Sequence, residues 1–298
     1  MVNVLLSTYN GEKYILEQLD SIEQQTYREF HVFIRDDGST DRTVPLIQEY
    51  IERNQLQNRF TMVAKENMGY SRSFYELLKI ADNGDYWAFC DQDDVWYANK
   101  LENAVSWLEK EDKNIPLLYQ GRVEIGNEDL SAKRNCDFYN FNFNYHNAFT
   151  SNIFFGFAMV INRCLYDKLI QADFEKIKYH DWFAAIIVAA LGKYKISDTV
   201  EAVHRQHEKN TSPTSFLKKI PDGIRLLKGD MFYTKNAREL YRLCYDELDE
   251  EQRSFCELFL NERYHITTAV KKAFYPKRWN PQIEVEFVLR ALMLIGKI

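Results

Sequence analysis

Apolar residues in the first hundred positions follow two alternating spacings. Short, nearly continuous apolar runs bounded by polar residues are typical of strands buried inside a sheet. Between these runs, apolar residues recur three or four positions apart, as on one face of an amphipathic helix. The runs predict four strands, at Val2–Ser7, Phe30–Arg35, Arg59–Ala64 and Tyr86–Cys90.

The segments between these strands predict helices. Within residues 13–24, apolar side chains share one helical face. A second helix is expected to begin near Ser39 or Thr40, with Pro45 tolerated in its first turn. Two further helices are marked by Phe74, Leu77, Leu78 and Ala81 and by Leu101, Ala104, Val105 and Leu108. This alternation predicts an α/β fold with a mostly parallel central sheet flanked by helices, in which ligands bind beyond the carboxyl ends of the strands.

The alternation becomes irregular after Ile125. Residues 127–150 are rich in Asn, Phe and Tyr and predict a long excursion. The later elements expected before the end of the domain are a strand at Phe154–Ile161, an apolar helix at Asp181–Leu191 and two short strands within 193–206. From Ser215 onward the pattern is helical. We therefore expect a catalytic domain over residues 1–215 and a C-terminal helical extension over 216–298.

The charge is uneven along the chain. Residues 216–298 carry 15 Lys and Arg against 12 Asp and Glu, a net +3, so the total of −6 leaves −9 for residues 1–215. An acidic front argues against nucleic-acid binding, which needs a basic footprint. The five cysteines are scattered without a Cys-x-x-Cys pair, and no apolar stretch approaches the ~20 residues of a spanning helix. With a strand already at the first residues in place of a signal peptide, a reducing cytoplasm is expected.

Polar and acidic clusters follow three of the predicted strands. They are Ser7–Gly11, Asp36–Ser39 and Asp91–Asp94. One such cluster would be an ordinary turn or helix cap. Three clusters at carboxyl ends of parallel strands favour a ligand site at that edge of the sheet.

The sharpest of these patterns is Asp91-x-Asp93. Two carboxylates directly after a buried strand can hold Mg²⁺ or Mn²⁺, hard cations that also bind phosphates. The alternative is a solvated acidic turn that caps the next helix through Asp94. A carboxylate in the Asp36–Asp37 pair can accept a hydrogen bond from a pyrimidine N–H, and Asn67-x-Gly69 allows close backbone approach to a ligand or forms a plain turn.

Several other site classes are disfavoured by motifs that the sequence lacks. It has no Gly-x-Gly-x-x-Gly and no Gly-x-x-x-x-Gly-Lys, which argues against a Rossmann dehydrogenase and a P-loop enzyme. His204 and His207 are three residues apart, but no second ligand pair completes a zinc site. His180 is expected to cap its helix or to pack beside Trp182.

Four motifs in order resemble glycosyltransferase family 2, which has the GT-A fold. They are Val4-Leu-Leu-Ser-Thr-Tyr-Asn10, Arg35-Asp-Asp-Gly-Ser-Thr-Asp41, Glu66-Asn-Met-Gly69 and Phe89-Cys-Asp-Gln-Asp-Asp-Val-Trp96. A subgroup, the bacterial rhamnosyltransferases of cell-wall polysaccharides, is similar also at Tyr179-His-Asp-Trp182, Arg205-Gln-His207 and Phe287-Val-Leu-Arg-Ala-Leu.

The resemblance implies a metal-dependent, inverting hexosyltransferase of cell-surface polysaccharide synthesis. Its donor would be dTDP-rhamnose or a UDP-sugar, and its acceptor a saccharide or lipid-linked saccharide. The implied nucleotide-sugar residues are Ser7, Tyr9, Asp37, Asn67, Gly69 and Asp91; the implied metal ligands are Asp91, Asp93 and His207; the implied general base is Asp181. The chain lacks the Gln-x-x-Arg-Trp signature of processive synthases, which favours transfer of a single sugar. Phe155-Gly156-Phe157 departs from the smaller residues expected beside that glycine.

Two other functions compete with this one. A catalytically inactive nucleotide-sugar-binding module is opposed by the retention of Asp91, Asp93 and Asp181. A nucleotidyltransferase is opposed by Thr8–Glu12, which is not the Gly-rich basic loop that holds a triphosphate.

The C-terminal region also suggests contact with a membrane. Basic residues at 271, 272, 277 and 278 precede the apolar stretch Phe287–Ile295, which is too short to span a bilayer. Such a stretch either lies in the interface, as a peripheral attachment to the inner face of the membrane, or packs on the domain.

Overall fold

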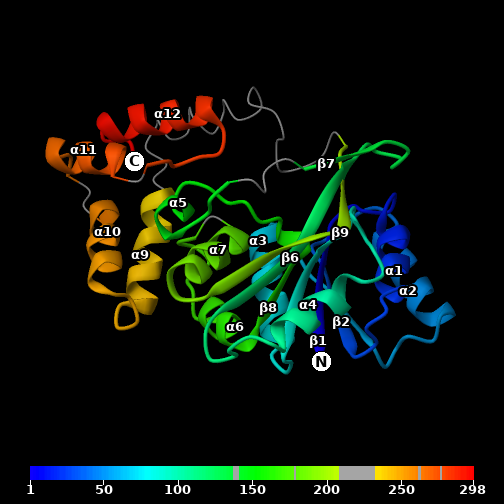
Figure 1. Cartoon of the computed structure of the whole chain (residues 1–298). Coiled ribbons are helices and arrows are strands. Elements are labelled where there is room, and N and C mark those ends of the chain that lie inside the picture. Colours follow the sequence, from blue (N-terminus) through cyan, green and yellow to red (C-terminus); the bar gives the residue numbers. More distant parts are fainter. Residues whose placement is uncertain (137–140, 178, 208–231, 261–262, 276) are drawn as a thin grey trace.

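The computed structural model describes the chain except for residues 137–140, 178, 208–231, 261–262 and 276. The described strands form one nine-stranded sheet in the order β3-β2-β1-β4-β8-β6-β9-β5, with β7 paired to β6. Helices cover both faces of the sheet, and the C-terminal helices form a layer at one side (Figure 1).

The first half of the sheet is parallel, as the alternation predicts. Its strands are β1 (Val2–Thr8), β2 (Phe30–Asp36), β3 (Phe60–Ala64) and β4 (Tyr86–Asp91). Ser7 of β1 lies opposite Arg35 of β2 on one side and Asp91 of β4 on the other. This register brings the three polar clusters to the same edge of the sheet.

The second half of the sheet is mixed and differs from the expectation. Residues 193–206 form one long strand, β9 (Lys193–Arg205), where two short strands were predicted. The strand stays continuous through its polar middle because it pairs with β6 (Leu117–Gly126), whose register shifts between Gln120 and Val123 absorb the irregularity. The sequence pattern did not reveal β6.

The strand predicted at Phe154–Ile161 is also shorter than expected. Only β8 (Met159–Asn162) is a strand, and a 3₁₀ turn at Gly156–Ala158 precedes it. The backbone N–H of Phe155 donates to the side chain of Gln120 at 2.7 Å instead of to a neighbouring strand. The remaining strands are β5 (Val95–Trp96), antiparallel to β9, and β7 (Lys133–Asn135).

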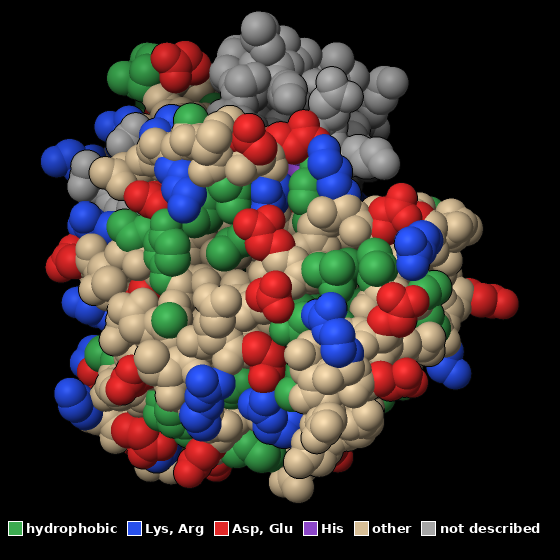
Figure 2. Space-filling view, turned by 90° about the vertical axis from the view of Figure 1, so that its right-hand side faces the viewer, with side chains coloured by type: hydrophobic (Ala, Val, Ile, Leu, Met, Phe, Trp, Pro, Cys, Tyr) green, Lys and Arg blue, Asp and Glu red, His purple; other side chains and the backbone are tan. Residues whose placement is uncertain are grey.

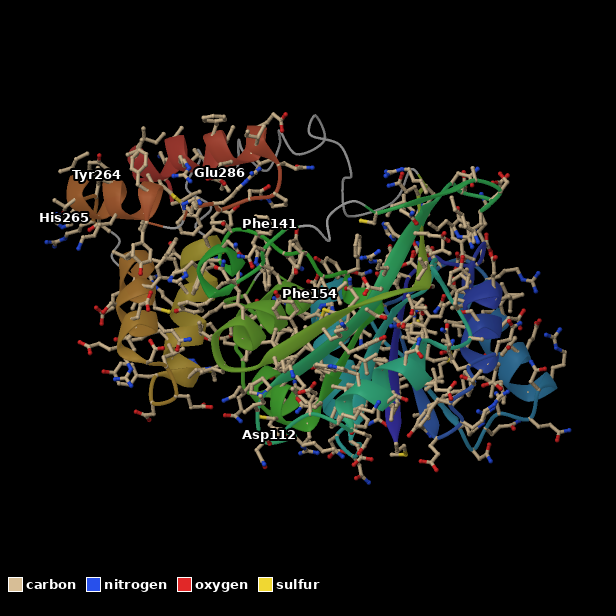
Figure 3. All side chains as sticks on the ribbon, viewed as in Figure 1. Asp112, Phe141, Phe154, Tyr264, His265 and Glu286 are labelled. Atoms are coloured by element: carbon tan, nitrogen blue, oxygen red, sulfur yellow. The ribbon has the colours of Figure 1, made fainter. Side chains whose placement is uncertain are left out.

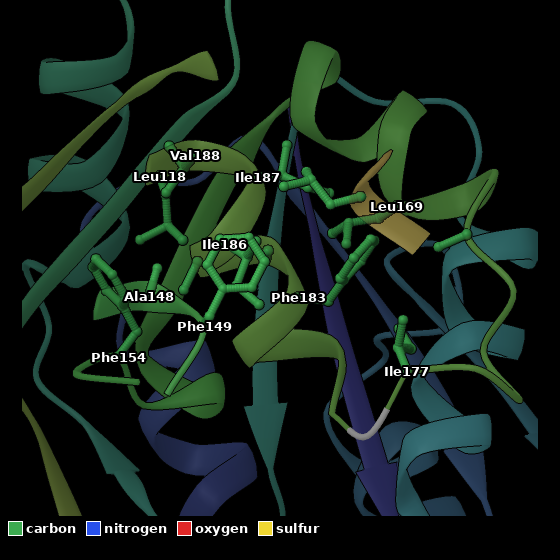
Figure 4. Close-up of a cluster of buried hydrophobic side chains, with 14 of the residues drawn as sticks. Leu118, Ala148, Phe149, Phe154, Leu169, Ile177, Phe183, Ile186, Ile187 and Val188 are labelled. Atoms are coloured by element: carbon green, nitrogen blue, oxygen red, sulfur yellow. The ribbon is translucent and has the colours of Figure 1, made fainter. Parts of the chain in front are cut away.

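The helices pack on the two faces of the sheet around separate apolar cores. One core lies under α1 (Ile15–Glu23), α2 (Thr43–Arg53) and α4 (Lys100–Leu108). The other contains α3 (Tyr70–Ile80), α6 (Arg163–Ile170) and α7 (His180–Leu191). Helix α7 is apolar almost all round because it is buried in this second core, beside the short helix α5 (Tyr145–Ala148) (Figure 4).

Helix α2 begins later than predicted. It starts at Thr43 and not near Ser39 or Thr40, and Pro45 remains in its first turn. Residues 39 and 40 are held by Asn10: the hydroxyl of Ser39 accepts from the Asn10 N–H, and the Thr40 N–H donates to the Asn10 side chain, both at 2.8 Å. These contacts draw the segment toward the end of β1 and delay the helix.

The regular elements that the structure describes in the C-terminal region are all helices. Its helices are α9 (Phe232–Cys244), α10 (Glu250–Leu260), α11 (Ile266–Phe274) and α12 (Ile283–Leu294). The part of the predicted helical region over 216–231 lies outside the described residues. Trp279 is fully buried between α11 and α12, and its carbonyl accepts from the hydroxyls of Thr150 and Ser151. None of the described helices combines the length and the apolarity needed to cross a membrane.

Candidate active site

The loop after β1 is locked to the acidic loop after β4 by one side chain, Gln92. Its Oε1 accepts from the Tyr9 N–H at 2.8 Å, and its Nε2 donates to the Tyr9 carbonyl at 2.9 Å. A Cβ at Gly11 would lie 2.2 Å from the Gln92 Oε1, so a larger residue there would displace this amide from Tyr9. The position of Gln92 within the Asp91–Asp94 cluster gives no sign of this contact in the sequence. The side chain of Tyr9 remains 48% exposed at this edge.

The loop after β2 is built around two buried carboxylates with different partners. Asp36 accepts from the hydroxyls of Thr8 and Ser39 and so ties the ends of β1 and β2. Asp37 is 2% exposed and forms an ion pair with Arg35 at 2.5 Å. Its two oxygens also accept from the N–H groups of residues 68 and 69, both at 2.9 Å.

These contacts shape the edge where the nucleotide is expected. Asp37 holds the Asn67-x-Gly69 turn, in which Gly69 has a φ of +85° and Asn67 is exposed. A Cβ at Gly69 would meet no atom within 4 Å, so the conformation and not crowding requires glycine there. The Ser7 hydroxyl shares a 2.7 Å hydrogen bond with Ser73 of α3.

The acidic loop meets the end of β9, because β5 pairs antiparallel with that strand. Asp93 Oδ2 lies 2.7 Å from the Nε2 of His207, and Asp94 Oδ1 lies 3.0 Å from the Nδ1 of His204. Asp94 is 1% exposed, and α4 does not begin until Lys100. The alternative of a solvated turn that caps the next helix through Asp94 is therefore wrong.

The acidic loop brings three carboxylates close enough together to change one another's pKa values. Burial, and then the charges of Asp94 and Asp93, raise the pKa of Asp91 well above its usual value. Burial by itself would lower the pKa of His204, but the carboxylates, Asp94 foremost, outweigh it and raise that pKa to about 9. His204 is thus a cation at neutral pH and balances part of the negative charge.

The residues of this loop fit a divalent cation. No group of three or more His, Cys, Asp or Glu side chains in the described residues is already arranged as a metal site. However, Asp94 Oδ2 is buried without a hydrogen-bond partner, and the 2.7 Å between Asp93 and His207 is close to the ~3 Å that separates neighbouring ligands of one octahedral ion. Asp91 and Asp93 supply the oxygen donors that Mg²⁺ and Mn²⁺ prefer.

Asp181 lies at the start of α7, close enough to Asp91 for its charge to contribute to the raised pKa of that residue. The N-cap of the helix is Tyr179, so Asp181 is not the cap. Burial raises the pKa of Asp181 to about 6, although a 3.0 Å hydrogen bond from Asn152 opposes the shift. A carboxylate with this pKa is mostly ionised at neutral pH and can still take up a proton.

Gly156 gives Asp181 the space that it occupies. A Cβ at Gly156 would lie 3.3 Å from the Cβ of Asp181 and 3.4 Å from the His180 Nε2. His180 is buried between Phe74 and Phe89, and neither of its ring nitrogens has a hydrogen-bond partner. Burial lowers the pKa of His180 to about 3, so the ring is neutral. His180 thus packs against these two rings and does not cap its helix.

Tyr70, which belongs to none of the sequence motifs, and Tyr179 border the same space. The rings of Tyr70 and Tyr179 stack with centroids 5.8 Å apart, and Tyr70 is 40% exposed. Desolvation, followed by the closeness of Tyr179 and Asp181, raises the pKa of Tyr70, and Asp91 contributes as well. Tyr70 therefore lies near both Asp181 and Asp91, where its exposed aromatic face can pack against a sugar ring.

The family model "Glycosyl transferase family 2" matches residues 3–169, more than half of the chain. The chain belongs to this family, and its fold is the GT-A fold that the sequence motifs indicate. It is thus a glycosyltransferase with its polar clusters at the sheet edge where this class of fold binds ligands.

Several similar proteins are glycosyltransferases of bacteria. A dTDP-rhamnosyl transferase, RfbG of Shigella flexneri, is 42% identical over 106 residues, which are 35% of this chain and 36% of that protein. An uncharacterized glycosyltransferase of Rickettsia typhi is 25% identical over 92% of this chain and 95% of its own length. A UDP-Glc:α-D-GlcNAc-diphosphoundecaprenol β-1,3-glucosyltransferase of Escherichia coli, WfgD, is 31% identical over 45% of this chain and 50% of that protein.

Solved structures share the fold at low identity. Staphylococcus aureus TarS 1–349 in complex with UDP-GlcNAc has a TM-score of 0.60 and 18% identity, over 99% of this chain and 79% of that one. The mannosyltransferase PcManGT of Pyrobaculum calidifontis, in complex with GDP-Man and Mn²⁺, has a TM-score of 0.57 and 18% identity, over 99% and 85% of the two chains.

Proposed function

We propose that this glycosyltransferase moves a hexose from a nucleotide-sugar to an acceptor hydroxyl with inversion at the anomeric carbon. The observation that carries the proposal is the position of Asp181, a buried carboxylate at the start of α7 whose charge acts on Asp91 of the acidic loop and whose pKa burial raises to about 6. In this proposal the acidic loop binds the donor diphosphate through a metal ion, and Asp181 acts on the acceptor hydroxyl.

The nucleoside end of the donor is proposed to lie along the ends of β1 and β2. Ser7 and the exposed Tyr9 line this edge. Asp37 is almost fully buried, so it acts there chiefly by fixing the backbone of the turn that contains Asn67 and Gly69. Asp91 lies beside Ser7 on the neighbouring strand β4. The ribose and diphosphate of the donor are proposed to bind at this position.

A divalent cation, Mg²⁺ or Mn²⁺, is proposed to bind Asp91, Asp93 and His207. When bound, it would balance the charge of the diphosphate and so favour its departure. We expect Asp93→Asn and His207→Ala to weaken Mn²⁺ binding about tenfold or more in a calorimetric titration of the donor-free protein. Unchanged Mn²⁺ affinity in both variants would remove these residues from the metal site.

The bond changes follow from the position of Asp181. Its carboxylate takes the proton of the acceptor hydroxyl as that oxygen attacks the anomeric carbon from the face opposite the diphosphate. The bond from the anomeric carbon to the diphosphate oxygen breaks, and the nucleoside diphosphate leaves with the electron pair. Asn152 orients the carboxylate through its 3.0 Å hydrogen bond, and the neutral ring of His180 beside it adds no positive charge.

For the donor sugar we propose rhamnose carried on dTDP, with a UDP-sugar as the alternative. The 42% identity to a dTDP-rhamnosyl transferase supports the first, and the likeness to WfgD, whose name specifies UDP-Glc, supports the second. That name also specifies a diphosphoundecaprenol-linked acceptor, which supports a lipid-linked saccharide as the acceptor class here.

The test of the proposed function compares Asp181→Asn with Asp246→Asn, the same change at an exposed site far along the chain. Each protein is incubated with a lipid-linked saccharide acceptor and with dTDP-rhamnose, UDP-glucose, UDP-GlcNAc or GDP-mannose, and the release of nucleoside diphosphate is measured. We expect Asp181→Asn to lower kcat by about 10²–10⁴-fold while donor affinity is kept, because general-base assistance contributes that much. The control should keep wild-type turnover.

Two results would contradict the proposal. Wild-type turnover in a folded Asp181→Asn protein would exclude Asp181 as the base. Tight donor binding without any release by the wild-type protein, with acceptors present, would favour the inactive binding module.

A further inference from the structure

The helices α11 and α12 carry a concentration of exposed apolar side chains. Sixteen large hydrophobic side chains are exposed in the described part of the chain, and nine of them lie between residues 264 and 295. Soluble monomers rarely leave such residues gathered on one surface. The nine are Tyr264, Ile266, Val270, Phe274, Tyr275, Ile283, Phe287, Val288 and Ile295.

The spacing of these residues shows that they form faces and are not scattered. On α11, Ile266, Val270 and Phe274 recur every fourth residue. On α12, Ile283 and Phe287 do the same, and Phe287 is 69% exposed. The inward side of α12 is separately filled by buried apolar residues, so this helix has an apolar face on each side. An exposed apolar face of this kind is normally covered by a partner or by a membrane.

The charges around these faces are predominantly positive. Arg263, Lys271, Lys277 and Arg278 are exposed in this region. Among the described residues from 263 to 298, Glu284 is the only exposed carboxylate side chain, because Glu286 is buried and paired with Arg290. An apolar face bordered by Lys and Arg matches the chemistry of an anionic lipid surface.

The orientation of α12 agrees with such a surface. In Figure 1 the parallel strands run upward from the end marked N, so their carboxyl ends and the site lie on the upper side of the sheet. Helix α12 lies along the upper side of the molecule as well, and Figure 3 places Tyr264 and His265 at the outer end of the α11–α12 pair. A membrane on this side would face both the helices and the active-site edge.

We propose that the outer faces of α11 and α12 dock on an anionic lipid surface, with Phe274, Ile283 and Phe287 entering the interface. The docking does not depend on the transfer reaction, so it goes beyond the proposed function. A second copy of the chain fits less well as the occupant. Two copies that met through this face would bring their positively charged borders together.

The test is flotation of the full-length protein with vesicles of phosphatidylcholine, with and without phosphatidylglycerol. The variant that carries Phe274→Ser and Phe287→Ser removes two side chains that solvent already surrounds, so the fold should persist. Tyr245→Ser, at an exposed aromatic residue after α9, is the matched control. A second variant with Lys271→Glu and Lys277→Glu tests the charge.

We expect the wild-type protein and Tyr245→Ser to float with the anionic vesicles, and more weakly with neutral vesicles or at high salt. The double Phe variant should lose about tenfold or more of its vesicle partitioning, since apolar burial would be removed. The double Lys variant should lose its preference for anionic vesicles. Transfer to a water-soluble acceptor should be unchanged in all variants, which separates this proposal from the chemistry of the site.

Three results would overturn the docking proposal. The first is a wild-type protein that floats with neither kind of vesicle. The second is a double Phe variant that floats as well as the wild type. The third is a dimer, detected by light scattering, that the double Phe variant converts to monomers, because the face would then be a contact between copies.

Discussion

At the scale of single residues, the site contains two histidines whose pKa values are shifted in opposite directions by their neighbours. His180 and His204 are both buried or nearly so, yet burial lowers the pKa of the first to about 3, while carboxylates raise that of the second to about 9. The difference is that His180 meets aromatic rings and His204 meets Asp94. Each ring is thereby held in one protonation state at neutral pH.

The same reasoning gives a pH dependence for Asp181. A general base must be ionised, so kcat should rise with pH through about 6 and then level off. Asn152 donates to the ionised form, and its loss should raise the pKa of Asp181 further. We expect Asn152→Ala to move the inflection of the kcat profile to higher pH and to lower kcat at neutral pH.

The control for this measurement is Asn58→Ala, at an exposed position before β3. Its pH profile should match that of the wild type. A profile of Asn152→Ala that keeps the wild-type inflection, or moves to lower pH, would show that Asn152 does not act on the base.

At the scale of elements, the loops after β1 and β4 are joined by the Gln92 side chain, and this contact should matter for the donor. Gln92→Ala removes two hydrogen bonds, and Gly11→Ala would place a Cβ where the amide lies. We expect either change to raise the donor KM about tenfold. The double variant should be no worse than either single one, because both act on one contact.

Gln57→Ala, at an exposed glutamine away from the site, provides the comparison for the steady-state kinetics. Effects that multiply in the double variant would mean that Gly11 and Gln92 act separately. An unchanged donor KM in Gln92→Ala would show that the loop keeps its shape without this side chain.

The elements differ in how far the sequence reveals them. The first four strands are local signals, because each is an apolar run beside a periodic helix, and β1, β2, β3 and β4 lie where these runs predict. The long β9 could not be recognised, since its polar middle is supported only by pairing with β6. For the same reason Phe154–Ile161 looked like a strand although a side chain of β6 holds part of it in a turn.

The site residues also differ in whether a local sequence signal reveals them. The motifs themselves indicate Asp91, Asp93 and Asp181, because these carboxylates lie in recognisable local sequences. Gln92 and Asn152 escaped notice because their partners are 83 and 29 residues away, and Tyr70 because only the fold stacks it on Tyr179. Contacts between distant loops leave no periodic pattern in the sequence.

At the scale of the whole molecule, the C-terminal helices share a core with the sheet. One cluster of buried residues runs from Trp87 and Phe183 to Phe255, Trp279 and Leu289. The division expected from the sequence, 1–215 and 216–298, therefore describes two regions of the chain that are packed around common apolar side chains.

This shared core predicts one cooperative unfolding transition. We expect Trp279→Ala to lower the free energy of unfolding by about 3 to 5 kcal/mol, as for large core truncations. Near-ultraviolet circular dichroism and retention of a bound donor should report the same midpoint in denaturant. Two separate midpoints, with only the later-numbered helices affected, would show instead that the regions unfold independently.

The face of the molecule shown in Figure 2 carries side chains of both charges. In the described part of the face shown in Figure 2, Lys and Arg side chains stand among Asp and Glu without a continuous basic area. The net charge of the sequence changes sign along the chain, from −9 over residues 1–215 to +3 over residues 216–298.

The placement of α12 on the same side as the strand ends has a kinetic consequence. A protein adsorbed there would search for its acceptor in two dimensions, so its rate would follow the mole fraction of lipid-linked acceptor in the bilayer and not the bulk concentration. Diluting that acceptor with inert lipid at constant total amount should slow transfer in proportion, whereas adding buffer should not. For a water-soluble acceptor the dependence should be the reverse.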